Sequence, residues 1–239
     1  MAERQARPHP HQAVPDPSGR YFAVNDLGTD RVLVLDGAAD AFSLVNHVPV
    51  EPAGCGPRHG AFFPVGASRA THYLVVCEMK NLVNVYSLAY GGPRGIDFNF
   101  EQSLSTLSAA GSVPAAAAGE LVIAPDNRNV YVSNRLSGPT DTIANFRIVA
   151  VPAPRTSTAC YRRAIRLELA GLTSTGGKNP RMFSIAHDGQ TLLVGNTEGD
   201  MAVVAMRRNQ DGTLPEKPVA SIAAKAFPGG KGPVFIQQI

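Results

Sequence analysis

The sequence contains no long apolar run and no cluster of basic residues. In its 239 residues, no apolar stretch approaches the roughly 18–20 residues that a membrane-spanning helix needs. Residues 1–8 hold no apolar stretch that could serve as a secretion signal. No run of five or more basic residues occurs, although the formal charge is +3. We therefore expect a cytoplasmic protein that binds neither membranes nor nucleic acids.

Cysteine is scarce, and the motifs of common catalytic centres are missing. Cys55, Cys77 and Cys160 are odd in number and show no C-x-x-C spacing. They predict neither a disulfide framework nor a cysteine zinc site, and we expect reduced thiols. No His, Asp or Glu spacing indicates a metal, and neither a nucleotide-binding Gly-rich loop nor G-x-S-x-G occurs. We expect no cofactor and no metal.

What the sequence does have is a repeat. With 44% hydrophobic and 17% charged residues, the composition is that of a globular protein. Four times, a short strand-like run leads through a turn into a second strand with polar residues at its end. The turn residues Pro17, Pro64, Pro125 and His187 lie 47, 61 and 62 residues apart. A four-stranded propeller blade takes roughly 40–50 residues before insertions, so the spacing predicts an all-β propeller.

The repeat also divides the chain. We expect a disordered leader at residues 1–8, followed by one incomplete β-propeller domain at residues 9–239. Its four-stranded antiparallel blades are expected at about residues 9–50, 55–110, 118–170 and 178–226. The Gly-Pro step at residue 232 resembles the start of an inner strand, so an extra closing strand is expected at 232–239. Such an array keeps two open sheet edges.

Aligning the repeats on their turns indicates a candidate site. Six positions before each turn residue, at the start of the innermost strand, stand His11, Arg58, Gly119 and Arg181. At the far end of the adjacent strand stand Asp26, Glu78 and Arg135. Because antiparallel pairing brings these two positions together, we expect them to meet at one mouth of a central channel. Charged groups near the propeller axis need a counter-charge or a ligand.

The chemistry of this set suits an anionic ligand. Arginines bind carboxylate or phosphate in a bidentate way, and His11 or Glu78 could act on a proton or on water. His9 and His59 flank the key positions as further binding candidates, and Glu120 is a weaker one. The alternative is that these polar groups only satisfy one another and trapped water.

The chain resembles the seven-bladed propeller lactonase family, which includes 6-phosphogluconolactonases and fungal carboxy-cis,cis-muconate cyclases. The resemblance is carried by motifs in all four repeats: His9-Pro-His-Gln12, Asp16-Pro-Ser-Gly19 and Asn25-Asp-Leu-Gly28; Gly56-Pro-Arg-His59 and Cys77-Glu78; Val132-Ser-Asn-Arg135; Asn179-Pro-Arg181, Asp188-Gly189 and Asp211-Gly-Thr-Leu214. The family usually has Asn-Glu in place of Cys77-Glu78.

The resemblance implies an enzyme acting on a small anionic lactone, phosphorylated or carboxylated. His11, Arg58, Glu78 and Arg135 would be catalytic, while Arg181, Asp26, His9 and His59 would bind substrate. Lactone hydrolysis and the reverse cyclisation both fit. The match covers four of seven blades, so the chain would be a fragment, a degenerate ring or one that pairs its open edges with another chain. A non-catalytic propeller scaffold is the alternative.

Overall fold

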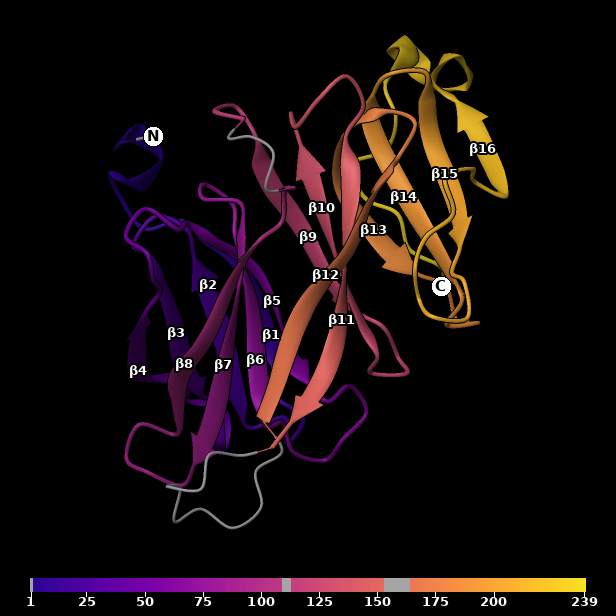
Figure 1. The fold of residues 1–239 in the computed structure, drawn as a ribbon. Coiled ribbons are helices and arrows are strands. Elements are labelled where there is room, and N and C mark those ends of the chain that lie inside the picture. Colours follow the sequence, from indigo (N-terminus) through magenta and orange to yellow (C-terminus); the bar gives the residue numbers. More distant parts are fainter. Residues whose placement is uncertain (1, 109–112, 153–163) are drawn as a thin grey trace.

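The structure is a computed structural model that describes residues 2–108, 113–152 and 164–239. Its strands form four separate four-stranded antiparallel sheets, each built from strands consecutive in the chain. Figure 1 shows the sheets following one another in chain order, with β4 at one side of the molecule and β16 at the other. The sheets do not close into a ring. The predicted fold class, an incomplete all-β propeller, is confirmed.

Each blade runs from its inner strand to its outer strand in chain order. Blade 1 contains β1 (Pro10–Pro15), β2 (Tyr21–Asp26), β3 (Arg31–Asp36) and β4 (Ser43–Pro49). Blade 2 contains β5 (Pro57–Phe63), β6 (His72–Cys77), β7 (Leu82–Tyr90) and β8 (Ile96–Ser105). Blade 3 contains β9 (Ala117–Ile123), β10 (Asn129–Arg135), β11 (Thr142–Val151) and β12 (Ala164–Ser174). Blade 4 contains β13 (Lys178–Ile185), β14 (Thr191–Glu198), β15 (Met201–Arg207) and β16 (Ala220–Ala223). The short 3-10 turns are η1 (Ala2–Gln5), η2 (Ala38–Asp40), η3 (Ala224–Ala226) and η4 (Pro228–Gly230).

The burial of each strand follows from how many neighbouring blades it has. Every residue of β6 and β10 is buried, because blades 2 and 3 are covered on both faces. The corresponding strands of the end blades, β2 and β14, contain several half-buried residues. Three apolar clusters fill the spaces between successive blades, and they are centred on Tyr73, Phe146 and Phe183. The core is thus a series of interfaces between blades.

Polar residues before the third strands hold the connecting turns. Asp141 accepts hydrogen bonds from the backbone N–H groups of Leu136, Ser137 and Asn179 at 2.7–3.0 Å. Asp30 and Asn81 have positive φ angles of 54° and 52°, a conformation that Asp and Asn tolerate better than most residues. These side chains maintain the blade geometry on which the candidate site depends.

Two expectations about the chain ends were wrong. Residues 2–5 form the 3-10 turn η1, and its Arg4 and Gln5 side chains bond to Glu78 and Asp30, so this segment is not a detached leader. The expected closing strand at 232–239 contains no strand. The Gly232 N–H bonds to the Thr197 carbonyl, so the segment begins along blade 4 but does not pair as a strand. Part of the expected third blade, residues 153–163, lies outside the described residues.

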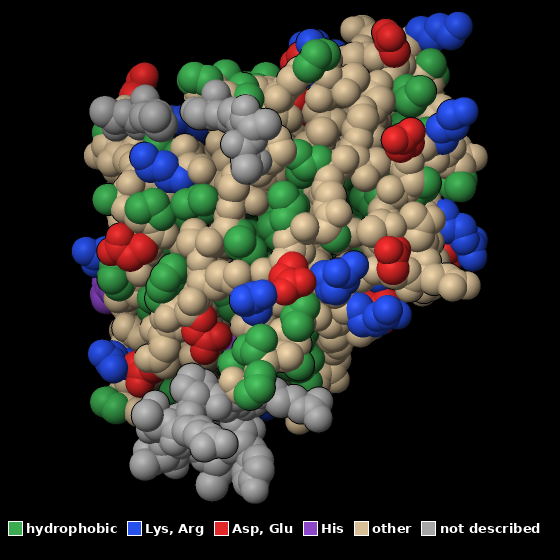
Figure 2. All heavy atoms as spheres, viewed as in Figure 1, with side chains coloured by type: hydrophobic (Ala, Val, Ile, Leu, Met, Phe, Trp, Pro, Cys, Tyr) green, Lys and Arg blue, Asp and Glu red, His purple; other side chains and the backbone are tan. Residues whose placement is uncertain are grey.

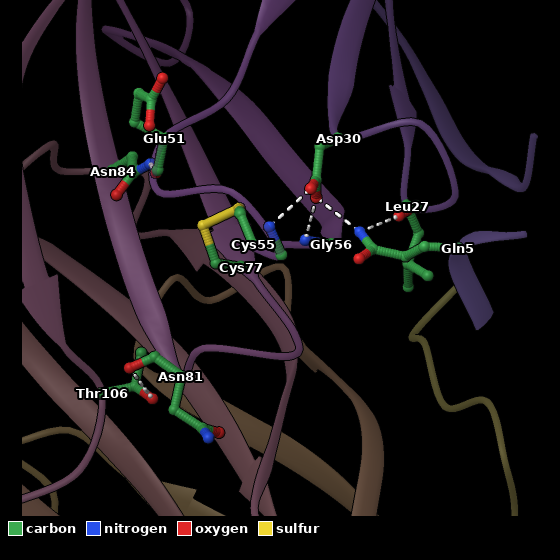
Figure 3. The surroundings of a disulfide bond; sticks show 11 residues. Gln5, Leu27, Asp30, Glu51, Cys55, Gly56, Cys77, Asn81, Asn84 and Thr106 are labelled. Atoms are coloured by element: carbon green, nitrogen blue, oxygen red, sulfur yellow. Dashed lines mark hydrogen bonds between the residues drawn. A yellow bond between two sulfur atoms is a disulfide. The ribbon is translucent and has the colours of Figure 1, made fainter. Parts of the chain in front are cut away.

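The expectation of reduced thiols was also wrong for two cysteines. Cys55 and Cys77 form a disulfide across a Cα–Cα distance of 4.6 Å. Asp30 accepts the N–H groups of Gly54 and Gly56, on either side of Cys55, at 2.6 and 2.7 Å (Figure 3). The two cysteines are 22 residues apart in the sequence, and this spacing matches no motif that would have predicted the disulfide. Only the propeller register places the start of β5 beside the end of β6.

The visible surface has a mixed charge. Figure 2 shows Lys and Arg side chains scattered among Asp and Glu on this face rather than gathered into one patch of a single sign. In the described parts of the chain, no helix has the length and apolar character required to cross a membrane.

Candidate active site

A β-bulge marks the candidate position in every blade. His11 is an extra residue between the pairs Pro10–Asp26 and Gln12–Asn25, and Arg181 is the equivalent extra residue in β13. In blade 2 the two residues Arg58 and His59 lie opposite one residue of β6. In blade 3 Gly119 and Glu120 lie opposite one residue of β10. Bulges redirect side chains and are common beside active sites.

Glu78 is the centre of a buried cluster of arginines. Its Oε1 lies 2.9 Å from Arg135 Nη2 and 2.7 Å from Arg4 Nη2, and its Oε2 lies 2.8 Å from Arg58 Nε. The Glu78 and Arg58 side chains are each only 3% exposed. Burial alone would raise the pKa of Glu78, but Arg135, Arg58 and Arg4 lower it below its ordinary value. Glu78 is therefore an ionised carboxylate that holds arginines together.

The two buried arginines of this cluster retain unused donors. Arg58 Nη1 and Arg135 Nε have no hydrogen-bond partner among the described residues. The 2.8 Å contact from Arg58 Nε to Glu78 also lacks hydrogen-bond geometry. Burial, together with the nearby Arg135, lowers the pKa of Arg58 to about 10, even though Glu78 opposes that change. An unsatisfied buried cation is costly, and a bound anion would relieve that cost.

Glycine at position 119 makes room for Arg135. A Cβ at this position would lie 2.5 Å from Ser133 Oγ and 3.2 Å from Arg135 Nε. The Arg135 guanidinium instead donates from Nη2 to the Ala118 carbonyl at 3.0 Å. The third repeat therefore lacks a side chain where the others carry His or Arg, because the arginine from the neighbouring strand occupies that space.

His11 and Arg181 lie within electrostatic reach of this cluster. Burial first, then Arg58, His59 and Arg181, lower the pKa of His11 to about 4, against the opposing effect of Glu78. His11 is thus neutral at pH 7. The structure therefore brings together four of the predicted residues, His11, Arg58, Glu78 and Arg135, with Arg181 nearby. Their roles stay predictions.

The Asp26 side chain and the His9 backbone take part in the turn that follows β2. Asp26 Oδ1 accepts the backbone N–H groups of His9, Gly28 and Thr29 at 2.7, 3.0 and 3.3 Å. The carboxylate is buried and is engaged in holding the turn that follows β2. The His9 carbonyl accepts the Leu27 N–H in the same turn. These contacts hold the turn in place, and the substrate-binding roles expected of Asp26 and His9 stay predictions.

His59 and Glu120 form a second polar pair beside the arginine cluster. His59 Nδ1 lies 2.6 Å from Glu120 Oε1, and the rings of His59 and His11 have centroids 5.0 Å apart. Glu120 is buried, with its N–H donated to Ser133 Oγ at 2.9 Å. Below this pair, a groove of about 490 Å³ follows β5, β9 and β13. Its polar lining includes Gln12, His59 and Glu120, and its apolar lining includes Ile123 and Met182.

Sequence reasoning missed one site residue and undervalued another. Arg4 was assigned to a disordered leader, and no local pattern shows that it reaches Glu78 across 74 positions. Glu120 was a weak candidate because it stands one position after Gly119. The signal that could have raised its rank is the blade-2 sequence Arg58-His59, because the bulge frees its second residue, as well as its first, from regular strand pairing. Within the described residues, no group of three or more His, Cys, Asp and Glu side chains is arranged to hold a metal ion.

Comparison with known proteins identifies the family of the chain. A family model described as a lactonase with a seven-bladed β-propeller matches residues 1–226. The chain belongs to the seven-bladed β-propeller lactonase family. A probable 6-phosphogluconolactonase of Arthroderma benhamiae is 32% identical over 222 residues, covering 90% of this chain and 52% of that protein.

Solved structures of this lactonase family superpose on the chain. A periplasmic gluconolactonase of Pseudomonas aeruginosa aligns with a TM-score of 0.73 and 26% identity, covering 96% of this chain and 57% of that one. A putative 6-phosphogluconolactonase of Bacteroides fragilis aligns with a TM-score of 0.69 and 26% identity, covering 92% of this chain and 56% of that one. The chain spans about half the length of the curated relatives it matches.

Proposed function

We propose that the chain carries the anion-binding and hydrolytic site of a lactonase acting on a small phosphorylated or carboxylated sugar lactone. The observation that carries this proposal is the pair of buried guanidinium groups with unused donors, Arg58 Nη1 and Arg135 Nε. Family membership supplies the reaction class, since relatives are named as gluconolactonase and 6-phosphogluconolactonase. Hydrolysis is proposed in preference to cyclisation because the names of these relatives describe hydrolases.

In this proposal the arginines recognise the anion. Arg58 and Arg135 are preorganised by Glu78, so few rotamers are lost when a phosphate or carboxylate binds. Arg181, which is exposed at the rim, extends the positive surface outward. The same guanidinium groups can stabilise the negative oxygen that develops when water attacks the lactone carbonyl. His11, neutral at pH 7, lies close enough to orient a hydroxyl or a water.

The compartment is a separate proposal. A cytoplasmic location was expected from the sequence, but the Cys55–Cys77 disulfide favours an oxidising compartment, because cytosolic thiols are normally kept reduced. Trapping free thiols by alkylation in intact cells, followed by mass spectrometry of the two cysteine peptides, decides between these locations. Unalkylated, linked peptides support the oxidising compartment, and two alkylated peptides support the cytoplasm.

The function is tested by assaying the purified chain with 6-phosphogluconolactone and with unphosphorylated gluconolactone. We expect hydrolysis above the spontaneous rate, with a lower KM for the phosphorylated lactone because its phosphate is an anion that the arginines can bind, whereas gluconolactone is uncharged. Arg58→Met should raise KM strongly, whereas Arg207→Met, which changes an arginine at the end of β15, should leave it unchanged. A wild-type chain that folds cooperatively but adds nothing to the spontaneous rate contradicts the proposal.

A further inference from the structure

We infer that His59 and Glu120 are the proton-transfer pair of this site, with His59 as the base that activates water and Glu120 as the group that orients it. The inference deepens the proposed lactonase function and rests on it. It differs from the sequence-based expectation, which gave the proton chemistry to His11 or Glu78 and placed His59 among the binding residues.

The fold builds this pair from two equivalent bulges in adjacent blades. The bulge in β5 frees His59 from regular pairing, and the bulge in β9 frees Glu120. Their side chains meet with Nδ1 and Oε1 2.6 Å apart. The Glu120 side chain is only 5% exposed, and the same oxygen accepts the Leu121 N–H at 2.9 Å. Glu120 is thus held in place by its own strand while it holds the ring.

A carboxylate on one ring nitrogen determines what the other nitrogen can do. When Glu120 accepts a hydrogen bond from the Nδ1–H group, the neutral imidazole carries its free lone pair on Nε2. This is the arrangement by which a carboxylate orients a catalytic histidine in many hydrolases. The His59 side chain is 14% exposed and lines the groove along β5, β9 and β13, so the ring is accessible from the groove. No catalytic arrangement of this kind surrounds the other polar residues of the site.

The alternative bases are less suitable. Glu78 is ion-paired with three arginines, which lower its pKa and make it a poor proton acceptor. His11, whose pKa is lowered to about 4, is also a weak base. The charged and titratable groups around His59 come from three blades: Glu120 on β9, His11 on β1, Arg58 on β5 and Glu78 after β6. Of these, only Glu120 makes a direct bond to the His59 ring.

The proposed reaction balances without a further reagent. His59 Nε2 takes a proton from water as the water oxygen bonds to the lactone carbonyl carbon, and the carbonyl electron pair moves onto oxygen. That oxyanion faces the guanidinium groups of Arg58 and Arg135. When the electron pair on the oxyanion re-forms the carbonyl bond, the ring C–O bond breaks, and the departing ring oxygen takes the proton from His59 Nε2. The products are a hydroxy acid and the restored neutral histidine.

The test compares His59 with a surface histidine. His59→Asn should lower kcat by roughly 10²–10⁴-fold, the contribution typical of general acid–base catalysis, with little change in KM. Glu120→Gln should lower kcat by a smaller factor. His47→Asn, on the exposed outer strand β4, is the matched control and should keep wild-type kinetics. Circular dichroism melting of each variant reports whether the fold is retained.

A second variant, His59→Gly, distinguishes loss of the base from loss of the fold. His59→Gly leaves space for free imidazole, which should restore part of kcat in a saturable manner if His59 acts as a base. No restoration is expected when imidazole is added to Glu120→Gln or to Arg58→Met. A folded His59→Asn variant with wild-type kcat, or a His59→Gly variant that imidazole does not rescue, overturns the inference while the lactonase function stands. An inactive, folded wild-type chain overturns both.

Discussion

Two arginines of this protein are equally buried and yet have opposite surroundings. Arg208, 6% exposed, bonds through Nε to Tyr131 Oη, through Nη1 to the Gly189 carbonyl and through Nη2 to Asp126, at 2.7–2.8 Å. Arg58, 2% exposed, keeps donors without partners. Burial would lower the pKa of each, but Tyr131 and Asp126 raise that of Arg208, whereas that of Arg58 falls to about 10.

The difference between the two arginines distinguishes a network that stabilises the fold from a cluster that can bind a ligand. The Arg208 network joins blades 3 and 4 through Tyr131, whose hydroxyl donates to the Gly212 carbonyl, and its donors are matched to protein acceptors. The Arg58 cluster gathers Arg58, Arg135 and Arg4 around one carboxylate, an excess of positive charge within the group. A network built for stability satisfies its own groups, while a binding site keeps groups for the ligand.

The largest expected effect is on the carboxylate at the centre of the Arg58 cluster. Glu78→Gln leaves two buried arginines without their shared counter-charge, which should cost about 3–5 kcal/mol of unfolding free energy. Urea unfolding followed by circular dichroism measures this cost. Asp126→Asn in the Arg208 network should cost about 1 kcal/mol or less, because Asp126 is partly exposed. Equal losses would remove the distinction between the two regions.

The disulfide is expected to give the next largest effect. Cys55 and Cys77 enclose a loop of about the size for which cross-linking stabilises by roughly 3 kcal/mol, so the double variant Cys55→Ser, Cys77→Ser should lose about that much. Because Cys77 precedes Glu78, and Arg58 follows Cys55 by three positions, the loss should be accompanied by weaker anion binding. Treating the double variant with a reductant is the control and should change nothing further. Anion affinity equal to that of the wild type would show that the disulfide does not position the cluster.

Replacing each buried arginine sharpens the comparison. Arg208→Met should cost about 2–3 kcal/mol, because it leaves Tyr131 and Asn129 without a donor, and it should not change anion affinity. Arg58→Met should cost less, about 1 kcal/mol, because Glu78 keeps Arg135 and Arg4 and a poorly satisfied cation is removed. Thermal and urea unfolding of both variants give the two values. A larger loss for Arg58→Met would mean that its role is mainly structural.

The smallest effect concerns pH. The pKa of His11 is about 4 in the folded protein and about 6.5 when unperturbed, so the unfolded chain binds a proton first as the pH falls. His11 should therefore reduce stability progressively from about pH 6.5 to about pH 4, and contribute nothing above that window. His11→Asn should flatten the pH dependence of unfolding in this range, whereas the control His187→Asn should not. Parallel curves for wild type and His11→Asn would contradict the assigned surroundings of His11.

The sequence was sufficient for the repeat and its register. The spacing of Pro17, Pro64, Pro125 and His187 predicted four blades. The position six residues earlier was predicted to bring His11, Arg58 and Arg181 towards one site, and the structure shows a β-bulge at each of these positions. These features repeat locally, so one chain carries several copies of the evidence.

Features that occur once could not be predicted in this way. The disulfide occurs in the second repeat alone, while the contact from Arg4 to Glu78 and the bond between His59 and Glu120 join segments from different repeats or from outside them. Residues 232–239 resembled the start of a blade, but the segment forms no strand in the structure. A motif predicts a strand only where a partner strand is present.

The most direct test of the central claim is ligand-linked stability with 6-phosphogluconate, which carries both a phosphate and a carboxylate. Urea unfolding of wild type, Arg58→Met and Arg208→Met is measured with and without this anion. At a concentration 100 times its Kd, the anion should stabilise wild type and Arg208→Met by about 2.7 kcal/mol and leave Arg58→Met unchanged. Equal stabilisation of Arg58→Met and wild type, or none in wild type, would contradict the assignment of the Arg58 cluster as the binding site.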